Sequence, residues 1–545
     1  MAAELNEDES TLELLQNHDS YDDSENPPPS HSNQQQWDYT PSSAKRITRR
    51  IQFFVYRIIV RILGELLPSF ITAWLLPESG VAPLPTPKIH PTSWLDGLRG
   101  LAALSVIVYH WLGFSWSGTD VGYGLSESHH SVMQLPILRV LYSGILDVSL
   151  FFVISGYALS VRPVKQMMGS EEQVSRLIQS FSSSIFRRFF RLYVPAWAST
   201  IPSFLWIWLD LDRPTGRWMK WGFVGHGSYA KAVANLHSPI YDHLATNSTA
   251  LPAPLRRDHA ARAVFSTEFA KWFNENIRSV TILEGSWPRQ KYENNYNHPM
   301  WTIPIEYRAS LLLFLVQIAV CRFRPVARMS ITALLMLFSL YVDHFEMILF
   351  LGGFFFAQLE PYLCILEHRW RHNRPVWTVY IIFTILVLVT GLHLASTPMW
   401  QPNATPGYIW LSAHIPSCFV REPVWFWPSV GSLLIVHAIG RLQSIQNILT
   451  SPKVQYLGQI SFSIYLLHYF TEVVVGTEVL YDFGRATSNL DRHNVALFWL
   501  GQGITLSCIL VLVVWLGDIW CRFVDTPSVT LAKWVETSLL VRKLL

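Results

Sequence analysis

Residues 93–111 read SWLDGLRGLAALSVIVYHW, an apolar stretch of helical length that carries Arg99 and His110 eleven positions apart. Eleven residues make about three turns of α-helix, so both side chains lie on one face, about 16 Å apart along the axis. An ionisable group costs several kcal/mol in hydrocarbon and is by default a functional candidate there. Arg99 alone could instead extend its guanidinium to the membrane surface, but the spaced pair favours function.

The composition around this stretch is that of an integral membrane protein. The 545 residues are 50% hydrophobic and only 15% charged, against about 25% charged in an average soluble domain. The 23 Trp and 31 Phe suit interfacial belts and lipid-facing helices. A net charge of +3 gives no support for nucleic-acid binding. The five Cys form no CxxC pair, so neither a disulfide framework nor a metal site is expected.

The first 90 residues differ from the rest of the chain. Residues 1–50 begin with ten Asp or Glu before the first Lys or Arg, which predicts a disordered, acidic cytosolic tail. No basic start followed by an apolar core is present there, so no cleavable signal peptide is expected. Residues 51–90 contain an apolar run interrupted by Arg57, Arg61 and Glu65, a pattern typical of an interfacial amphipathic helix followed by a linker.

Residues 91–522 alternate between apolar segments of spanning length and short polar connections. We therefore expect an all-α polytopic membrane domain with about ten transmembrane helices, a long lumenal loop over 210–300 between the third and fourth, and a cytosolic C-terminal tail over 523–545. The expected spans lie near 97–116, 136–160, 187–209, 302–321, 328–342, 345–364, 376–395, 425–440, 459–478 and 497–519.

Charge asymmetry between the connections predicts the orientation. Lys and Arg gather before the first span and in the even-numbered connections, which places both termini in the cytosol. The sequons at Asn247 and Asn403 fall on the opposite side, where they are candidate glycosylation sites. The expected membrane is the endoplasmic reticulum or another endomembrane, with the plasma membrane as an alternative.

Basic residues open the third expected span at the cytosolic surface. The run RRFFR contains Arg187, Arg188 and Arg191, and one interpretation is a simple positive-inside anchor. Together with Arg99 and the small residue Ser155, the run could instead form an anion pocket, since guanidinium groups match phosphate geometry.

Polar residues also occur at the lumenal depth of His110. Glu306, in HPMWTIPIEY, could orient the His110 ring and stabilise its imidazolium form, or it could pair with Arg308 or face water. The ninth expected span, with SFSIYLLHYF, carries Tyr465 and His468. A lone histidine on an apolar helix is more often a core residue than a catalytic one.

Taken in order, LDGLRGLAALSVIVYH, LFFVISGYALS, RRFFRLYVP, WTIPIE and ISFSIYLLH resemble the acyltransferase 3 family, and especially its fungal members. These are multi-span, acyl-CoA-dependent O-acyltransferases. The resemblance implies essential roles for Arg99 and His110 and carries family motifs onto Phe151, Phe152, Ser155, Gly156, Arg187, Arg188, Arg191 and Glu306. The chain reads ILDVSLFF where bacterial members read GVDLFF, which displaces Asp147 from the motif and leaves its role in doubt.

The resemblance also implies an activity. An acyl group, expected to be acetyl, would pass from cytosolic acyl-CoA to a hydroxyl of a lipid, glycan or secondary metabolite, with no permanently bound cofactor. His110 would act as general base or as a transient acyl carrier, Glu306 would assist it, and the arginines with Ser155 would hold the donor. Two other classes stay open: a secondary transporter with intramembrane ionisable groups, and a catalytically inactive membrane sensor on the same fold.

Overall fold

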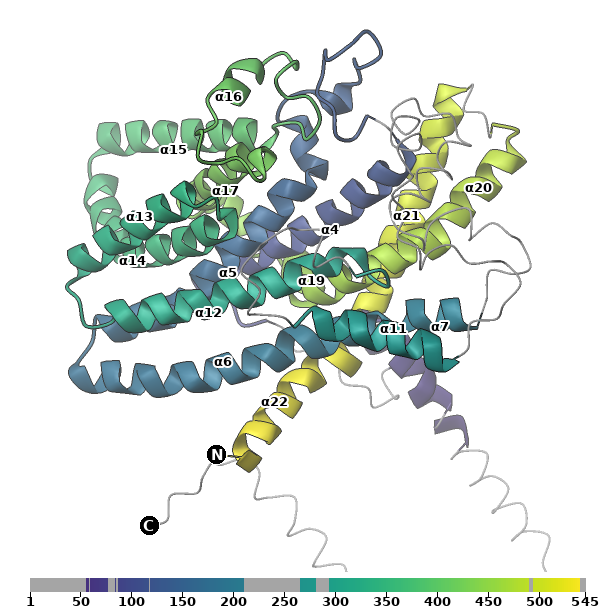
Figure 1. Ribbon diagram of the computed structural model, residues 1–545, viewed down its shortest axis with the longest axis horizontal. Helices are drawn as coiled ribbons and strands as arrows, with labels where there is room; N and C mark the ends of the chain where they lie inside the picture. The colour runs from purple at the N-terminus through teal and green to yellow at the C-terminus, as the bar shows by residue number, and fades with distance from the viewer. Residues whose placement is uncertain are drawn as a thin grey trace, which may run out of the picture. The chain divides into compact units, whose positions relative to one another are not determined.

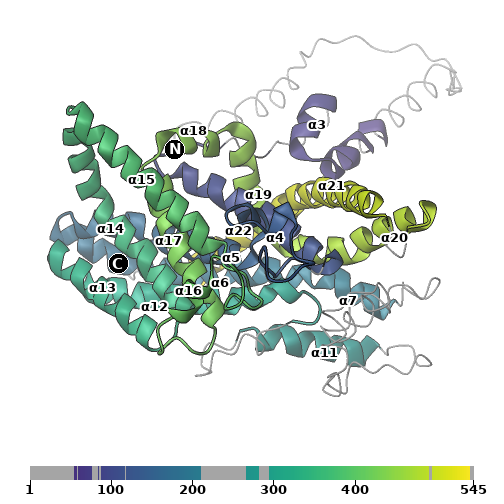
Figure 2. The same cartoon turned by 90° about the horizontal axis from the view of Figure 1, so that it is seen from above.

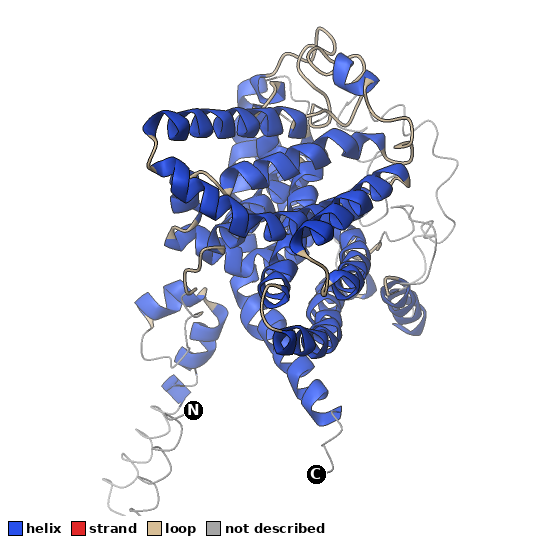
Figure 3. Cartoon of the chain, turned by 90° about the vertical axis from the view of Figure 1, so that its left-hand side faces the viewer, coloured by secondary structure: helices blue, strands red, loops and turns tan. Residues whose placement is uncertain are grey.

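The computed structural model describes residues 55–57, 59–76, 84, 87–116, 118–209, 265–280, 294–489 and 494–539. Every regular element within these ranges is helical, as Figure 3 shows. The predicted acidic tail over 1–50 and the sequon at Asn247 lie outside the described residues.

Two helices from opposite ends of the domain form its centre. The first predicted span is α4 (Ser93–Ser115), which lies against α19 (Pro452–Thr471). Glycines allow this approach: a Cβ on Gly458 would lie 2.4 Å from the Asp96 carbonyl oxygen, and one on Gly100 would lie 2.5 Å from the Gly458 amide nitrogen. Small residues at a helix interface let the two backbones come close, as in other membrane helix pairs.

A second glycine contact joins α5 (Gly144–Met167) to α14 (Phe345–Arg371). A Cβ on Gly156 would lie 2.3 Å from the Phe350 carbonyl oxygen, and one on Gly353 would lie 2.4 Å from the Tyr157 amide nitrogen. Gly156 of the FFVISGY motif therefore serves helix packing. Figure 1 shows α5 running beside α4, with α12, α13 and α14 beyond it.

Seven described helices are long and apolar enough to cross a membrane, and a pair bent by 97° is an eighth candidate. The total of ten predicted from the sequence would also require α13 (Pro325–Tyr341), which has 17 residues, and the segment of α6 (Glu171–Ser199) with α7 (Ile201–Trp208). The seven are Ser93–Ser115, Gly144–Met167, His298–Val320, Phe345–Arg371, Arg374–Ala395, Pro452–Ala486 and Val495–Leu539, and the bent pair is Pro423–Ile439 with Gln443–Leu449.

Both predicted peripheral segments contain helices that pack on the membrane domain. The C-terminal segment includes α22 (Thr526–Leu539), which lies along α6. The N-terminal segment includes α3 (Ser69–Leu75), where the Ser69 hydroxyl donates to Asp518 at 2.7 Å on α21 (Val495–Trp520). Figure 2 shows α3 beside α21. Apolar side chains such as Trp74 stay exposed on α3, which suits the predicted interfacial placement.

The predicted lumenal loops are partly ordered by their own contacts. Buried Arg139 donates to the Ser396 carbonyl at 2.9 Å and to the Thr119 carbonyl at 3.0 Å, which ties the loop after α4 to the loop around residue 400. Within the predicted 210–300 loop, the structure describes α11 (Phe265–Arg278), whose Trp272 indole donates to Thr200 at 2.7 Å.

Candidate active site

Arg99 is held by two hydrogen bonds to α19 and by one acid on its own helix. Its Nε donates to the Ser461 hydroxyl at 2.8 Å, its Nη2 donates to the Gly458 carbonyl at 2.9 Å, and Asp96 lies 3.3 Å from the same Nη2. The side chain is 31% exposed. The guanidinium is thus fixed in direction, and part of the side chain is exposed.

His110, at the other end of α4, lies beside a second histidine. The His110 and His468 ring centroids are 5.2 Å apart, and Tyr469 lies 6.0 Å from His110. His468 is fully buried, with Nδ1 2.7 Å from the Tyr465 carbonyl oxygen. A carbonyl only accepts hydrogen bonds, so Nδ1 carries the hydrogen and the Nε2 of the neutral ring keeps a lone pair.

Tyr465 is fixed in the same region. Its hydroxyl donates to the Pro299 carbonyl at 2.6 Å and lies 2.7 Å from the Thr302 hydroxyl. These bonds tie α19 to the start of α12 (Thr302–Val320). The structure therefore brings His468 next to His110, a proximity that the sequence could not supply, and Tyr465 lies next to His468.

Glu306 lies with the arginines. Its Oε1 accepts a hydrogen bond from Arg188 at 2.8 Å and one from the Ser155 hydroxyl at 3.0 Å. The Arg188 and Glu306 side chains are 10% and 17% exposed. Arg188, from another helix, is thus a partner of Glu306, and the expected assistance of Glu306 to His110 stays a prediction.

The remaining arginines meet carboxylates from the C-terminal end of the chain. Arg187 Nε lies 3.3 Å from Glu536 on α22. Asp525, just before α22, interacts electrostatically with both Arg191 and Arg99. Neither acid was predicted as a site residue, because the sequence places both in an apparent tail and nothing in its pattern links them to RRFFR.

Two other predicted residues lie apart from this arrangement. Asp147 is buried and lies near Ser105, which sits six residues after Arg99 and therefore about 120° around α4 from the Arg99 and His110 face. Asn403 is exposed in the loop around residue 400, as a glycosylation site must be.

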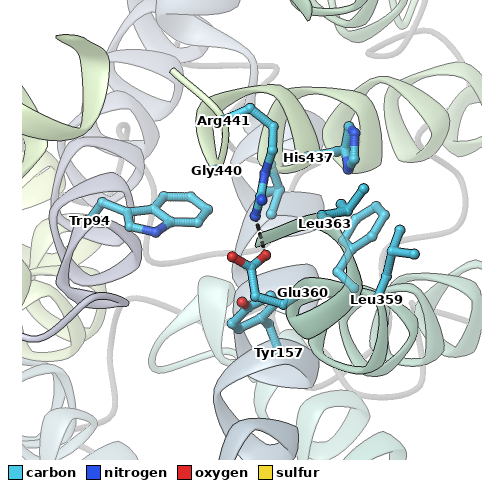
Figure 4. Close-up of a pocket in the computed structure, with 10 residues that line it drawn as sticks. Trp94, Tyr157, Leu359, Glu360, Leu363, His437, Gly440 and Arg441 are labelled. Atoms are coloured by element: carbon cyan, nitrogen blue, oxygen red, sulfur yellow. Dashed lines mark hydrogen bonds and ion pairs between the residues drawn. The ribbon is translucent and has the colours of Figure 1, made fainter. Parts of the chain in front are cut away.

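A second pocket lies between α4, α5, α14 and α17 (Phe426–Ile439), lined by Trp94, Tyr157, His437 and other residues. Figure 4 shows Arg441 directed at Glu360 across it. Arg441 also bonds Glu367 at 3.1 Å. Its charge is thus matched by two carboxylates, and none of the predicted site residues lines this pocket.

Most of the chain matches a known protein family. The family described as "Acyltransferase domain", of the acyltransferase 3 type, matches residues 92–518. The chain belongs to the acyltransferase 3 family. The match covers both ends of the site, from Arg99 on α4 to His468 on α19.

Curated relatives agree with this assignment. O-acetyltransferase PaAT-1 of Phomopsis amygdali is 27% identical over 83% of this chain and 86% of its own length. Acyltransferase clz18 of Cochliobolus lunatus is 26% identical over 81% and 95%, and acyltransferase R4 of Phoma sp. is 25% identical over 82% and 96%. No solved structure matches the chain. The protein is therefore an acyltransferase with several candidate membrane spans, which confirms the resemblance seen in the motifs.

Proposed function

We propose that this protein is a membrane-bound O-acetyltransferase that transfers acetyl from cytosolic acetyl-CoA to a hydroxyl of a lipid, glycan or secondary metabolite. The observation that carries the proposal is the arrangement of one helix pair. Arg99 and His110 lie on one face of α4, and α19 contacts both, through Ser461 at one end and His468 at the other. The printed name of the relative from Phomopsis amygdali supports oxygen as the acceptor atom and acetyl as the group.

The donor is proposed to bind along this face. Its phosphates would lie at the cytosolic end, against Arg99, Arg187, Arg188 and Arg191, with Ser155 nearby, since guanidinium groups bind phosphate oxygens in pairs. The pantetheine arm is on the order of the axial separation between Arg99 and His110. Phosphates at the arginines would then leave the thioester beside the histidines.

The chemistry needs one base. His110 removes the proton from the acceptor hydroxyl, the oxygen attacks the thioester carbonyl carbon, and the carbon–sulfur bond breaks. The proton held on His110 passes to the departing thiolate, so the products are the ester and free CoA. In a covalent variant the imidazole itself attacks the thioester, the carbon–sulfur bond breaks and CoA leaves with the imidazole proton. The acceptor oxygen then attacks the acetyl-imidazole, and its proton returns to the imidazole nitrogen as the ester is released. Both routes need His110 neutral at the start.

Glu306 is proposed to act on the donor side. It accepts bonds from Arg188 and Ser155, so it holds both groups in place for the phosphates. The sequon at Asn403, and the one at Asn247 outside the described residues, are proposed to face the lumen of an endomembrane compartment. Glycan-dependent gel shifts that disappear with Gln at either position would support that orientation.

The test is acetyl transfer by membranes that contain His110→Ala. We expect turnover of labelled acetyl-CoA to be lost while expression and CoA binding stay near wild type. His437→Ala, which removes a histidine from the separate pocket of Figure 4, is the matched control and should keep activity. Comparison of metabolites from cells with and without the protein identifies the acceptor. Full turnover by His110→Ala refutes the role of His110, and substrate transport without consumption of acetyl-CoA favours the transporter class.

A further inference from the structure

Glu472 is a carboxyl group buried in the membrane domain without a protein partner among the described residues. Its side chain is fully buried, and neither oxygen makes a hydrogen bond within the described part of the chain. Glu306, by contrast, is paired with Arg188. A buried carboxyl without partners is costly, so its retention calls for a compensating role.

The backbone at Glu472 is itself unusual. Glu472 opens η9, a π-helical turn (Glu472–Gly476) between α19 and α20 (Thr477–Ala486). Single π turns inside α-helices occur frequently at functional sites. Glu472 follows His468 by four residues, so the buried imidazole and the buried carboxyl occupy one side of the same continuous helix.

The π turn packs against the residue that follows His110. A Cβ on Gly476 would lie 2.7 Å from Cζ3 of Trp111 and 2.7 Å from Cδ1 of Ile509 on α21. A larger residue at this position would force the Trp111 or Ile509 side chain to shift, because α4, η9 and α21 converge there. Glu472 therefore belongs to the helix junction directly beyond the two histidines.

Two buried hydrogen-bond donors come from the other helices of this junction. Trp111 Nε1 on α4 and Gln502 Nε2 on α21 are buried and make no hydrogen bond within the described residues. Gln502 Oε1 accepts from Ser115 at 2.9 Å, and Ser115 also donates to the Trp111 carbonyl at 2.8 Å. The junction thus combines two donors with the acceptors Glu472 and His468 Nε2.

We propose that Glu472, Trp111 and Gln502 form the binding site for the polar end of a lipophilic, hydroxylated acceptor. A hydroxyl hydrogen bonds to the Glu472 carboxyl, and the acceptor's oxygens accept from the indole and the amide. This inference rests on the proposed function, because it supplies the second substrate of the same reaction. The acceptor's reactive hydroxyl then lies beside His110 and His468. Glu472 is a binding residue and takes no part in the transfer of acetyl.

The test compares Glu472→Leu with Gln455→Leu in the full chain reconstituted in nanodiscs. Gln455 is an equally buried polar residue of α19, but its amide donates to the Ser93 and Leu449 carbonyls. Gln455→Leu should lower the melting temperature because it leaves two carbonyls unbonded. Glu472→Leu should keep or raise it, because it removes a carboxyl that no protein group satisfies. A fall as large as that of Gln455→Leu overturns the inference.

The ligand measurement uses decane-1,2-diol as probe and its dimethyl ether as the compound without hydroxyl hydrogens. The diol should raise the melting temperature of the wild type and not of Glu472→Leu, and the ether should raise neither. Where the diol is acetylated, Glu472→Leu should raise the KM for the diol at least about tenfold, which corresponds to the loss of one hydrogen bond. The KM for acetyl-CoA should not change. Equal stabilisation of both proteins by the diol, or none of the wild type, overturns the inference. Diol binding that depends on Glu472 keeps the inference even if the diol itself is not acetylated. The acetyltransferase proposal fails separately if metabolites from cells with and without the protein show no difference in acetylated products.

Discussion

Replacement of Gly458 by Ala should separate the two helices that carry the site. The new Cβ would lie 2.4 Å from the Asp96 carbonyl oxygen and 2.7 Å from the carbonyl carbon. Both are backbone atoms, so relief to an ordinary contact of about 3.4 Å requires α4 and α19 to move about 1 Å apart. Overpacking of this kind costs about 1–3 kcal/mol, which exceeds the gain of about 1 kcal/mol from Ala over Gly in a helix.

The same movement should reduce activity more than it reduces stability. The Gly458 carbonyl and the Ser461 hydroxyl bind Arg99, and His468 lies beside His110 ten residues further along the same helix. A displacement of about 1 Å can lower turnover about 100-fold. We therefore expect Gly458→Ala to fold with a lower melting temperature and to lose most acetyl transfer from acetyl-CoA.

Gly113→Ala is the matched control for this substitution. It lies on α4 as well, but a Cβ there meets no atom within 4 Å. It should be neutral or slightly stabilising and should keep full turnover. Melting temperature and turnover are measured on both variants in the same nanodiscs. Wild-type values for Gly458→Ala would refute the argument that the close approach of α4 and α19 positions the site.

Three further substitutions test the charged contacts. Glu536→Gln frees Arg187 from a partly exposed ion pair worth at most about 1 kcal/mol. The KM for acetyl-CoA should therefore fall up to about fivefold at unchanged kcat. A raised KM would count against the proposal that Arg187 binds acetyl-CoA. Glu306→Gln leaves the charge of the largely buried Arg188 without its carboxylate and should lower the free energy of unfolding by about 3 kcal/mol in a denaturation assay. Adding Arg188→Met to the same chain should restore part of that loss. An unchanged free energy of unfolding would show that the pair does not stabilise the fold. Arg139→Met removes the bonds between the two loops predicted to be lumenal. It should speed their hydrogen exchange and proteolysis without loss of the helices, and unchanged exchange would contradict the link.

The sequence predicted the helical face of the site but could not predict its partners. The spacing of Arg99 and His110 follows from local helix geometry, which a sequence contains. Their contacts with Ser461 and His468 join residues more than 350 positions apart, and such contacts depend on tertiary packing. Seven or eight described helices qualify as candidate spans. The other two predicted spans correspond to α13, which has 17 residues, and to 187–209, which includes RRFFR and ends in a separate short helix. Apolar content alone does not show such a break.

The arginines that are proposed to bind the donor's phosphates are already paired with carboxylates. Arg99 lies against Asp96, Arg188 against Glu306, and Arg187 against Glu536. Arginine charges left unpaired at the edge of a low-dielectric interior would destabilise the fold, so the carboxylates are needed for stability. A phosphate that reaches the arginines therefore replaces or shares existing carboxylates, and the net gain in binding free energy is small. Affinity for the donor should then depend more on the fit of the whole acyl-CoA along α4 than on its charge. Asp525 and Glu536, near the C-terminus, add carboxylates that compete with the donor's phosphates for the arginines.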